Sequence, residues 1–332
     1  MVRLKHESEL AKLRLQLDAT DRTKVVSLDG PTATIPSAMS APASKQIPDD
    51  VDQRLALTAY LTDFENRIFN GDCCDIVPRL PPGTIDLVCT SPVYADQRKN
   101  QYGGVPEADY PAWTVKWMAE VHRVLKPTGN VAIVIRSHVH NWELSDYVLR
   151  TRLALREWGW IECDELIWEK PDGPALGNNV FPRRSWESIL WFSKNRKPYC
   201  DSKANGRPCD NIGQCGFSAK GQGKWVGGVK DRRLSGIARC RDIVPIPVAL
   251  NAKGNSHPAQ YPAKLAEWIV RLLCPECGVV LDPFMGAGST AEGVLRAGGE
   301  RRYVGIDVNA QYCREAEARI EAFIGNLLNE KE

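Results

Sequence analysis

The sequence predicts an α/β protein built around a mainly parallel β-sheet. From about residue 60 onward, short apolar runs rich in β-branched residues alternate with amphipathic segments of helical spacing, and this alternation is typical of a sheet with helices on its faces. The chain has 332 residues, of which 43% are hydrophobic and 25% charged, so it can form one large domain or two ordinary ones. No apolar run approaches the roughly 20 residues of a membrane span, and the mixed charges of the first residues are unlike a secretory or transit signal.

Seven short runs are expected to be strands because they are apolar and β-branched, and five longer segments are expected to be helices because their apolar residues repeat at helical spacing. The expected strands are Arg67–Asn70, Ile85–Thr90, Val131–Ile135, Ile161–Trp168, Ile189–Phe192, Val279–Leu281 and Tyr303–Ile306. The expected helices are Tyr110–Leu125, Trp142–Trp158, Pro262–Leu273, Ser289–Ala297 and Ala310–Leu327.

The first fifty residues differ from the rest of the chain. Leu10, Leu13 and Leu17 repeat at helical spacing, which predicts a short helix over residues 5–19. Residues 27–50 combine four prolines with Ser, Ala and Thr, a composition typical of a flexible linker. This part is therefore expected to be an N-terminal arm and linker, which either contacts a second copy of the chain or is a plain tail.

The stretch from Lys194 to Asp242 breaks the alternation and is strongly basic. It contains twelve Lys and Arg residues against four Asp residues, a local charge of +8 in a chain whose formal net charge is +2. Eight glycines are spread through it, with aromatic residues such as Phe217 and Trp225 among them. This composition is typical of a surface that contacts nucleic acid, although a solvated insertion has a similar composition. The candidate contacts are Lys220, Lys224, Lys230, Arg232 and Arg233.

The strongest local motif covers residues 279–290. A predicted strand runs into Asp282, a turn containing Gly286 and Gly288 follows, and a helix then begins. Glycines at such a turn allow a ligand to approach the backbone. Asp307 follows the next predicted strand, 25 residues after Asp282, where a carboxylate can accept hydrogen bonds from the ribose of a nucleoside cofactor. The turn lacks the third glycine of dinucleotide-binding proteins, and a carboxylate before it suits a cationic ligand better than a pyrophosphate.

A second motif, Ser91–Tyr94, follows the predicted strand Ile85–Thr90. Pro92 ends that strand and stiffens its exit. The serine hydroxyl, the neighbouring carbonyls and the flat face of Tyr94 then come together at the carboxyl end of a strand, where open α/β sheets bind their ligands. Polar acceptors beside an aromatic ring suit a planar base with an exocyclic amine, although an ordinary exit from a strand could have the same sequence.

Together these motifs resemble those of the beta class of amino-group DNA methyltransferases, which transfer a methyl group from S-adenosyl-L-methionine to the exocyclic amine of a flipped base. In that class a Ser/Asp-Pro-Pro-Tyr tetrapeptide precedes an Asp-Pro-Phe-x-Gly-x-Gly turn, and here Ser91–Tyr94 precedes Asp282–Gly288. The resemblance covers about residues 64–325. Its further segments are Asn70–Asp72, Arg123–Gly129, Ile167–Lys170, Arg183–Lys194 and His257–Lys264.

The resemblance implies roles for the motif residues. The expected cofactor-binding residues are Asp72, Pro258, Asp282, Phe284, Gly286, Gly288, Ser289, Thr290 and Asp307. Within this set, Asp307 would bind the ribose, Asp72 the adenine amine, and Ser289 and Thr290 the carboxylate of the cofactor. The expected catalytic residues are Ser91, Pro92 and Tyr94. The first two would hold the target amine and the tyrosine would stack on the base, while Arg98, in the following loop, would contact DNA.

For the fold, the resemblance implies a seven-stranded methyltransferase (Rossmann-like) sheet, with the order 3-2-1-4-5-7-6 in the family's convention and one antiparallel strand. The sheet would be circularly permuted, because the strand before Asp72 would lie beside the strand that ends at Asp307. The expected parts are the arm and linker over 1–50, a catalytic half over 51–193, an inserted target-recognition region over 194–250 and a cofactor-binding half over 251–332.

Two residues of the tetrapeptide bear on the reaction. In this class Ser-Pro-Pro-Tyr usually accompanies methylation of cytosine N4 and Asp-Pro-Pro-Tyr that of adenine N6, so Ser91 favours cytosine N4, with adenine N6 as the alternative. Val93 replaces a proline and restores a backbone N–H, which leaves a catalytically impaired DNA-binding module as another alternative. The expected partner is double-stranded DNA and not a membrane, with a second copy of the chain and a cognate restriction endonuclease as further candidates. The expected location is the cytoplasm, in a bacterial, archaeal or phage-encoded context.

The eleven cysteines indicate free thiols in a reducing compartment. Cys274 and Cys277 form a CxxC pair without a partner pair at zinc-finger spacing. Buried or unreactive thiols are the preferred interpretation, so no metal is expected. The alternative is a metal held by this pair together with Cys200, Cys209 and Cys215.

Overall fold

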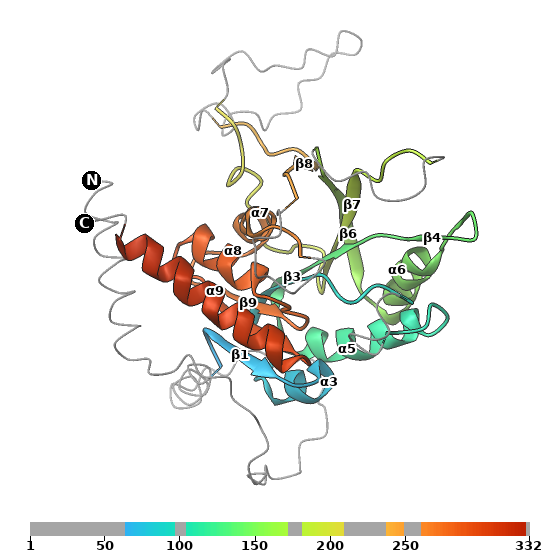
Figure 1. Cartoon of the computed structure of the whole chain (residues 1–332), viewed down its shortest axis with the longest axis horizontal. Helices are drawn as coiled ribbons and strands as arrows, with labels where there is room; N and C mark the ends of the chain where they lie inside the picture. Colours follow the sequence, from blue (N-terminus) through green and yellow to red (C-terminus); the bar gives the residue numbers. More distant parts are fainter. Residues whose placement is uncertain (1–63, 97–103, 172–180, 209–236, 249–259, 330–332) are drawn as a thin grey trace.

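The computed structural model describes residues 64–96, 104–171, 181–208, 237–248 and 260–329. Within them, eight strands form one sheet with the order β1-β10-β9-β2-β3-β7-β6-β8, and helices lie on both of its faces (Figure 1). The strands are β1 (Arg67–Asn70), β2 (Ile85–Thr90), β3 (Leu125–Ile135), β6 (Ile161–Glu169), β7 (Trp186–Ser193), β8 (Ile243–Pro245), β9 (Val279–Asp282) and β10 (Arg302–Asp307).

The strand order confirms the predicted methyltransferase-type sheet. When β9, β10 and β1 take family positions 1, 2 and 3, the first seven strands read 3-2-1-4-5-7-6. β7 is antiparallel to both neighbours, and the other pairs in the sheet are parallel. The predicted permutation is present as well, because β1 pairs with β10 and Asn70 lies opposite Asp307.

One strand of the large sheet was not predicted. β8 pairs in parallel with β6, so that Ile167 lies opposite Ile243 at the edge of the sheet. The strand has three residues and ends in Pro245, and a short proline-containing edge strand gives almost no periodic signal in a sequence. It lies within the residues 194–250 that were expected to form a target-recognition region, so this region also contributes to the sheet.

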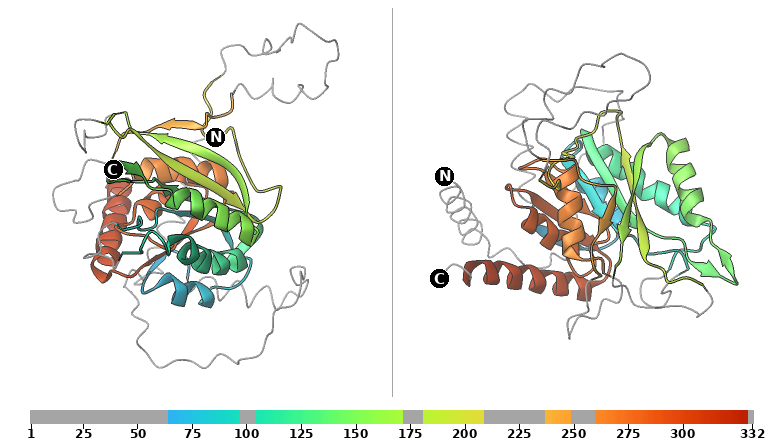
Figure 2. Two further views of the ribbon diagram at one scale, coloured as in Figure 1. Left: turned by 90° about the vertical axis from the view of Figure 1, so that its right-hand side faces the viewer. Right: turned by 90° about the horizontal axis from the view of Figure 1, so that it is seen from above.

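Two helical layers enclose the sheet (Figure 2). The helices are α3 (Cys73–Ile76), α5 (Tyr110–Val124) and α6 (Tyr147–Trp158), with the short 3-10 helix η1 (Val77–Arg79), and α7 (Ala263–Leu273), α8 (Ser289–Ala297) and α9 (Ala310–Asn329). The first group contributes to one buried cluster and α7, α8 and α9 to the other. β3 alternates between the two clusters, since Val131 and Ile133 belong to the first while Ala132 and Val134 belong to the second.

Some boundaries differ from those predicted. The helix expected to begin at Trp142 begins at Tyr147, because a hairpin of β4 (Val139–His140) and β5 (Glu143–Leu144) precedes it. The helix and linker predicted within the first fifty residues lie outside the described residues. In the described part of the chain, no helix combines the length and the apolar character that crossing a membrane requires.

Candidate active site

The two predicted motifs meet at one edge of the sheet, where parallel strands have their carboxyl ends. Asp282 ends β9 and Asp307 ends β10, while Ser91 follows β2 and Asp72 follows β1 by two residues. In the sheet, β10 lies on one side of β9 and β3 lies on the opposite side of β2, so successive strands are added in opposite directions from the point where β9 and β2 meet. Such a reversal is where open α/β sheets form a crevice for ligands.

Asp282 is almost fully buried and is held by several neighbours. Its Oδ1 accepts hydrogen bonds from Thr90 Oγ1 at 2.6 Å and from the Phe284 N–H at 3.0 Å. Its Oδ2 accepts the hydroxyl of Thr290, and the Tyr261 hydroxyl lies 3.5 Å from the same oxygen. Burial raises the pKa of Asp282 to about 6, although the hydrogen bonds act in the opposite direction.

The hydrogen bond between Thr90 and Asp282 joins the two motifs directly. Thr90 ends β2 and precedes Ser91, whereas Asp282 ends β9 and opens the glycine turn, 192 residues further along the chain. Tyr261 reinforces this junction, because its hydroxyl also lies 4.0 Å from the Cys89 thiol of β2. The start of the tetrapeptide and the start of the turn are therefore held at a fixed separation.

The turn between β9 and α8 requires its glycines. Gly286 and Gly288 have φ values of 53° and 84°, in the left-handed region that favours glycine. A Cβ on Gly288 would lie 2.9 Å from the Cβ of Ala316 on α9, which is too close. The Gly286 N–H donates to Asp307 Oδ2 at 2.8 Å, so the turn is also bonded to the end of the next strand.

Asp307 keeps capacity for a ligand although the backbone engages both of its oxygens. Oδ2 accepts the Gly286 N–H and Oδ1 accepts the Asn309 N–H, each at 2.8 Å. Each carboxylate oxygen can accept a second hydrogen bond, which matches the two hydroxyls of a ribose. Burial raises the pKa of Asp307, while these backbone hydrogen bonds act the other way.

Two hydroxyls of the predicted cofactor set, at the start of α8, have specific partners. The Ser289 hydroxyl accepts a hydrogen bond from Arg319 at 3.0 Å. The Thr290 hydroxyl is engaged by Asp282 and Tyr261, which leaves backbone N–H groups in the first turn of α8 as donors for a carboxylate.

Phe284 and Asp72, the other described members of the predicted cofactor set, lie in different surroundings. Phe284 is half-buried, and its ring packs 5.4 Å from Trp113 and 5.3 Å from Trp117 on α5. Asp72 is exposed, and its carboxylate caps α3 by accepting the Cys74 N–H at 2.8 Å. The Asp72 carboxylate therefore serves as a helix cap, and it lies close to the thiols of Cys73 and Cys74.

These groups fit an adenosine cofactor that carries a positive charge. Asp282 and Asp307 place two buried carboxylates beside one glycine turn, and the charge of Asp307 contributes to the raised pKa of Asp282, after burial. Such a pair repels a phosphate but attracts a sulfonium and the hydroxyls of a ribose. The structure thus brings Asp282, Gly286, Gly288 and Asp307 together.

Tyr94 of the tetrapeptide is tied to a mostly buried ion pair. Its hydroxyl donates to Glu187 Oε2 on β7 at 2.8 Å, and the other oxygen of Glu187 pairs with Lys170. Burial, followed by the charge of Glu187, raises the pKa of Tyr94 well above its ordinary value, so the phenol remains a neutral donor. The Val93 carbonyl accepts the Tyr110 hydroxyl at 2.8 Å, which fixes the tetrapeptide backbone to α5.

Ser91 and Pro92 complete the tetrapeptide. Ser91 is half-buried and Pro92 is buried. The Ser91 side chain is within hydrogen-bonding reach of Tyr94, so the predicted catalytic side chains lie together at the end of β2.

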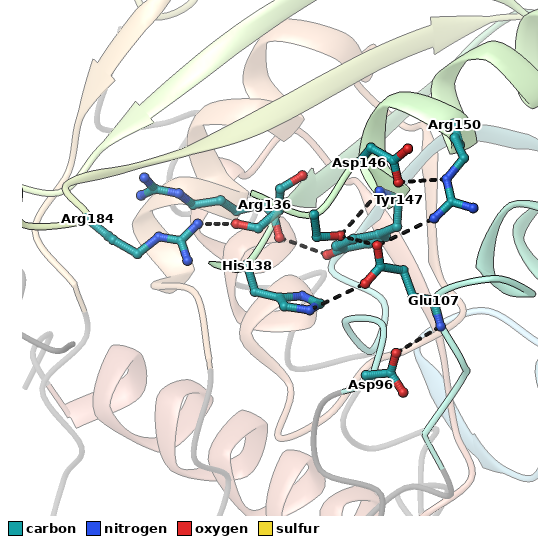
Figure 3. A network of polar contacts seen from close by, with 10 residues as sticks. Asp96, Glu107, Arg136, His138, Asp146, Tyr147, Arg150 and Arg184 are labelled. Carbon is teal, nitrogen blue, oxygen red and sulfur yellow. Dashed lines mark hydrogen bonds and ion pairs between the residues drawn. The ribbon is translucent and has the colours of Figure 1, made fainter. Parts of the chain in front are cut away.

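A polar network surrounds Glu107 (Figure 3) and reaches Asp96, two residues after the tetrapeptide. Glu107 accepts the Ser145 hydroxyl at 2.6 Å and pairs with Arg150 at 3.4 Å and with His138 at 3.6 Å. Its backbone N–H donates to Asp96 Oδ2 at 3.0 Å. This contact joins the two ends of the segment that follows the tetrapeptide.

The sequence did not reveal the roles of Thr90, Lys170 and Glu187. The resemblance placed Tyr261 in a segment expected to line the cofactor pocket, but not its contacts with Asp282 and Thr290. Glu187 is 93 residues from Tyr94, so no local spacing links the two. Thr90 carried the clearest available signal, because it is a polar residue at the end of an otherwise apolar strand that leads into the tetrapeptide.

Several predicted residues lie outside the described residues. They are Arg98, Pro258, Lys220, Lys224, Lys230, Arg232 and Arg233, together with Cys209 and Cys215 of the alternative metal site. Among the described residues, the side chains close enough to hold a metal are Asp72, Cys73 and Cys74, and Cys200, Cys274 and Cys277 are not among them. Cys274 is buried, and burial raises its pKa to about 12, which keeps it a thiol.

Comparisons with known proteins agree with this geometry. The family model of the N6/N4 DNA methylases matches residues 85–318. The type II methyltransferase M.ScaI of Streptomyces caespitosus is 26% identical over 292 residues, covering 82% of this chain and 86% of that protein. The type II methyltransferase M.BglII of Bacillus subtilis is 27% identical over 264 residues, covering 74% of this chain and 66% of that protein, just under two thirds of its length.

Two solved structures support the fold. The PvuII DNA methyltransferase (cytosine-N4-specific) has a TM-score of 0.58 at 21% identity, covering 79% of this chain and 92% of that one. The TTHA0409 protein of Thermus thermophilus, complexed with S-adenosyl-L-methionine, has a TM-score of 0.52 at 24% identity, covering 78% and 96%. The family model extends over well more than half of the chain and includes both motifs of the sheet edge. The protein therefore belongs to the N6/N4 family of DNA methylases, whose cofactor is S-adenosyl-L-methionine.

Proposed function

We propose that the protein is a site-specific DNA methyltransferase that transfers the methyl group of S-adenosyl-L-methionine to the exocyclic amine of a flipped base. The observation that carries this proposal is the 2.6 Å hydrogen bond between Thr90 and Asp282. It couples the tetrapeptide, which suits an amine on a planar base, to the glycine turn, which suits a cationic nucleoside. A methyl transfer needs these two ligands held at one separation.

The residues of this chain act mainly by positioning. The bound cofactor supplies an activated methyl group on its sulfonium. Asp307 holds the ribose, and the backbone of the turn at Gly286 and Gly288 lets the methionine part approach closely. Ser91 and the Pro92 carbonyl accept hydrogen bonds from the target amine and thereby aim its lone pair at the methyl carbon.

Tyr94 supplies the surface on which the flipped base stacks. Its hydroxyl is held by Glu187, which Lys170 holds in turn, so the ring has a defined orientation before the base arrives. A preoriented ring removes part of the entropic cost of placing the base. Glu187 is thus a positioning residue rather than a group that touches the reacting atoms.

Cytosine N4 is the proposed target atom. Ser91 supports it, since serine at this position usually accompanies N4 methylation in the class that the sequence resembles. The cytosine-N4-specific PvuII enzyme among the similar folds also supports it. Adenine N6 is the alternative, and only the identity of the methylated base in the product distinguishes the two.

Purified protein incubated with methyl-labelled S-adenosyl-L-methionine and unmodified duplex DNA tests the proposal. We expect label in the DNA and, after hydrolysis to nucleosides, N4-methyldeoxycytidine. N6-methyldeoxyadenosine would retain the enzyme class but overturn the choice of base. Absence of label from DNA of mixed sequence, with cofactor binding shown by calorimetry, would overturn the proposal.

A binding module without turnover is less well supported. Its basis is Val93 in place of proline, yet the Val93 carbonyl is anchored by the Tyr110 hydroxyl at 2.8 Å. This bond restrains the turn from the carbonyl side of Val93, although no proline ring fixes its φ. Val93→Pro is therefore expected to change the transfer rate by less than about threefold. An inactive wild type that Val93→Pro activates would favour the binding module.

The remaining parts of the proposal concern context. We propose double-stranded DNA as the partner and the cytoplasm as the location. We also propose that the chain is divided into a catalytic half, a basic target-recognition region over 194–250 and a cofactor-binding half. Contacts with a second copy of the chain or with a cognate restriction endonuclease are proposals that sedimentation analysis and co-purification can test.

A further inference from the structure

Beyond the paired ends of β3 and β7, the two chain segments remain side by side. The guanidinium of Arg136 lies 4.7 Å from the centre of the Trp186 ring. Arg184 donates a hydrogen bond to the Ser137 carbonyl. The segment after β3 and the segment before β7 therefore lie beyond the carboxyl end of β3, on the edge where the parallel strand β2 leads into the tetrapeptide. Figure 3 shows Arg184 in contact with the first of these segments.

Five residues on these segments form what we call the arginine–aromatic surface. They are Arg136, Trp142, Phe181, Arg184 and Trp186. The three aromatic side chains are 68%, 45% and 41% exposed, in chain order. The rings of Trp142 and Phe181 contact each other, with centroids 5.5 Å apart, so these apolar groups cluster at the surface.

Trp142 is unfavourable for folding at its position. It is the second residue of the two-residue loop between β4 and β5, and Asn141 and Trp142 have φ values of 49° and 68°. Hairpin loops of this kind favour Asn followed by Gly, and a bulky residue at positive φ is an outlier. Neither burial nor backbone conformation accounts for this tryptophan. Strained residues of this kind often serve a function at the surface that they present.

The surface borders the base side of the site. Trp186 directly precedes Glu187, which accepts the Tyr94 hydroxyl at 2.8 Å. Arg136 and Arg184 lie near each other (Figure 3). Burial and the charge of Arg184 lower the pKa of Arg136, while Glu187 and Tyr94 act in the opposite direction. Two neighbouring positive charges favour an anionic partner over a second copy of the same surface.

We propose that the arginine–aromatic surface binds an unstacked nucleotide of the substrate DNA beside the flipped target base. Aromatic rings stack on the face of any base, and arginine attracts the adjoining phosphates. Extruding a target base from a duplex disturbs the stacking of its neighbours, so such a nucleotide is available at this position. The inference rests on the proposed function, because it requires that the substrate is DNA.

The decisive variant is Trp142→Gly, because it separates binding from folding. Glycine suits the positive φ of the loop, so the melting temperature is expected to stay the same or rise. Loss of one stacked base is expected to weaken binding of a fluorescent single-stranded 20-mer of thymidine by roughly tenfold in an anisotropy titration. Binding of a fully paired duplex of equal length is expected to weaken less.

Trp158→Ala is the matched control, since Trp158 is 42% exposed on α6 and lies outside the arginine–aromatic surface. It is expected to bind the single strand within about twofold of wild type. A single-stranded probe containing bromodeoxyuridine, cross-linked by ultraviolet light, is expected to label peptides that contain Trp142, Phe181 or Trp186.

Three results would overturn the inference. Trp142→Gly could bind the single strand as wild type does, Trp158→Ala could lose as much affinity, or Trp142→Gly could dissociate a dimer in sedimentation without changing DNA affinity. The last result would assign the surface to a second copy of the chain. A methylation assay run in parallel keeps the two proposals apart. If wild type methylates DNA and Trp142→Gly binds the single strand as wild type does, only this inference is refuted. If Trp142→Gly shows the expected loss of binding but wild type transfers no methyl group, only the proposed function is refuted.

Discussion

The cofactor side and the base side of the site are built in different ways. On the cofactor side, Asp282 binds Thr290 eight residues away, and Gly286 binds Asp307 at a separation of 21 residues. On the base side, Tyr94 depends on Glu187, which is 93 residues distant. The glycine turn and Asp307 on the cofactor side therefore come from one βαβ unit, formed by β9, α8 and β10, while the base side depends on the alignment of separate strands.

Asp282 belongs to both sides, so its replacement should have the largest effect. Asp282→Asn removes the negative charge. It also replaces one of the two carboxylate oxygens that accept the hydroxyls of Thr90 and Thr290. We expect methyl transfer to fall by roughly 100-fold or more, with weaker binding of S-adenosyl-L-methionine in calorimetry. A variant that retains wild-type transfer would show that the two sides are not coupled through this carboxylate.

The same carboxylate should make stability depend on pH. Its pKa is about 6 in the folded protein, raised by burial, against roughly 3.9 when unfolded. The folded state therefore holds the proton more tightly, and this group's contribution is fully present below about pH 4 and is lost as the pH rises through 6. The loss is on the order of 2 to 3 kcal/mol.

Urea unfolding of wild type and Asp282→Asn between pH 4 and pH 7 measures this contribution. The variant should show a weaker decline in unfolding free energy over that interval, because asparagine does not titrate. Parallel curves for the two proteins would contradict a titrating Asp282.

Gly288→Ala should damage the cofactor side alone. Alanine there meets both a φ of 84° and the Cβ of Ala316 at 2.9 Å, so we expect a loss of about 2 kcal/mol in unfolding free energy. Gly83→Ala is the matched control, because Gly83 has a φ of 66° but no atom lies within 4 Å of where its Cβ would be. Its loss should be about 1 kcal/mol. Equal losses would mean that the close approach of α9 to the turn costs nothing.

Glu187→Gln should affect the base side alone and has the smallest expected effect. Glutamine keeps the size but weakens the hold on Tyr94 and removes the pair with Lys170. We expect kcat to fall by roughly tenfold with an unchanged Kd for S-adenosyl-L-methionine.

Glu162→Gln is a suitable control, because Glu162 pairs with Arg152 on α6 and takes no part in the site. It should retain the wild-type kcat. A change in cofactor affinity on Glu187→Gln, or an equal loss on Glu162→Gln, would contradict a specific role of Glu187 in orienting Tyr94.

The same contrast explains how much the sequence could predict. The strand order and the roles proposed for Asp282, Gly286 and Asp307 could be predicted, because turn motifs are local and the class keeps its motifs in order. The partners of Tyr94 could not, because nothing within a few residues of Tyr94 or Glu187 reports that β2 and β7 bring them together. β8 was also missed, since a three-residue edge strand has no period to detect.

The central claim is that the site formed by the tetrapeptide and the glycine turn transfers a methyl group to DNA. The most direct test uses cells. DNA from cells expressing wild type or Ser91→Ala would be sequenced with detection of modified bases. We predict N4-methylcytosine in one recurring sequence context with wild type and none with Ser91→Ala. DNA left unmodified by a wild-type protein that binds S-adenosyl-L-methionine, or equal modification by both proteins, would contradict the claim.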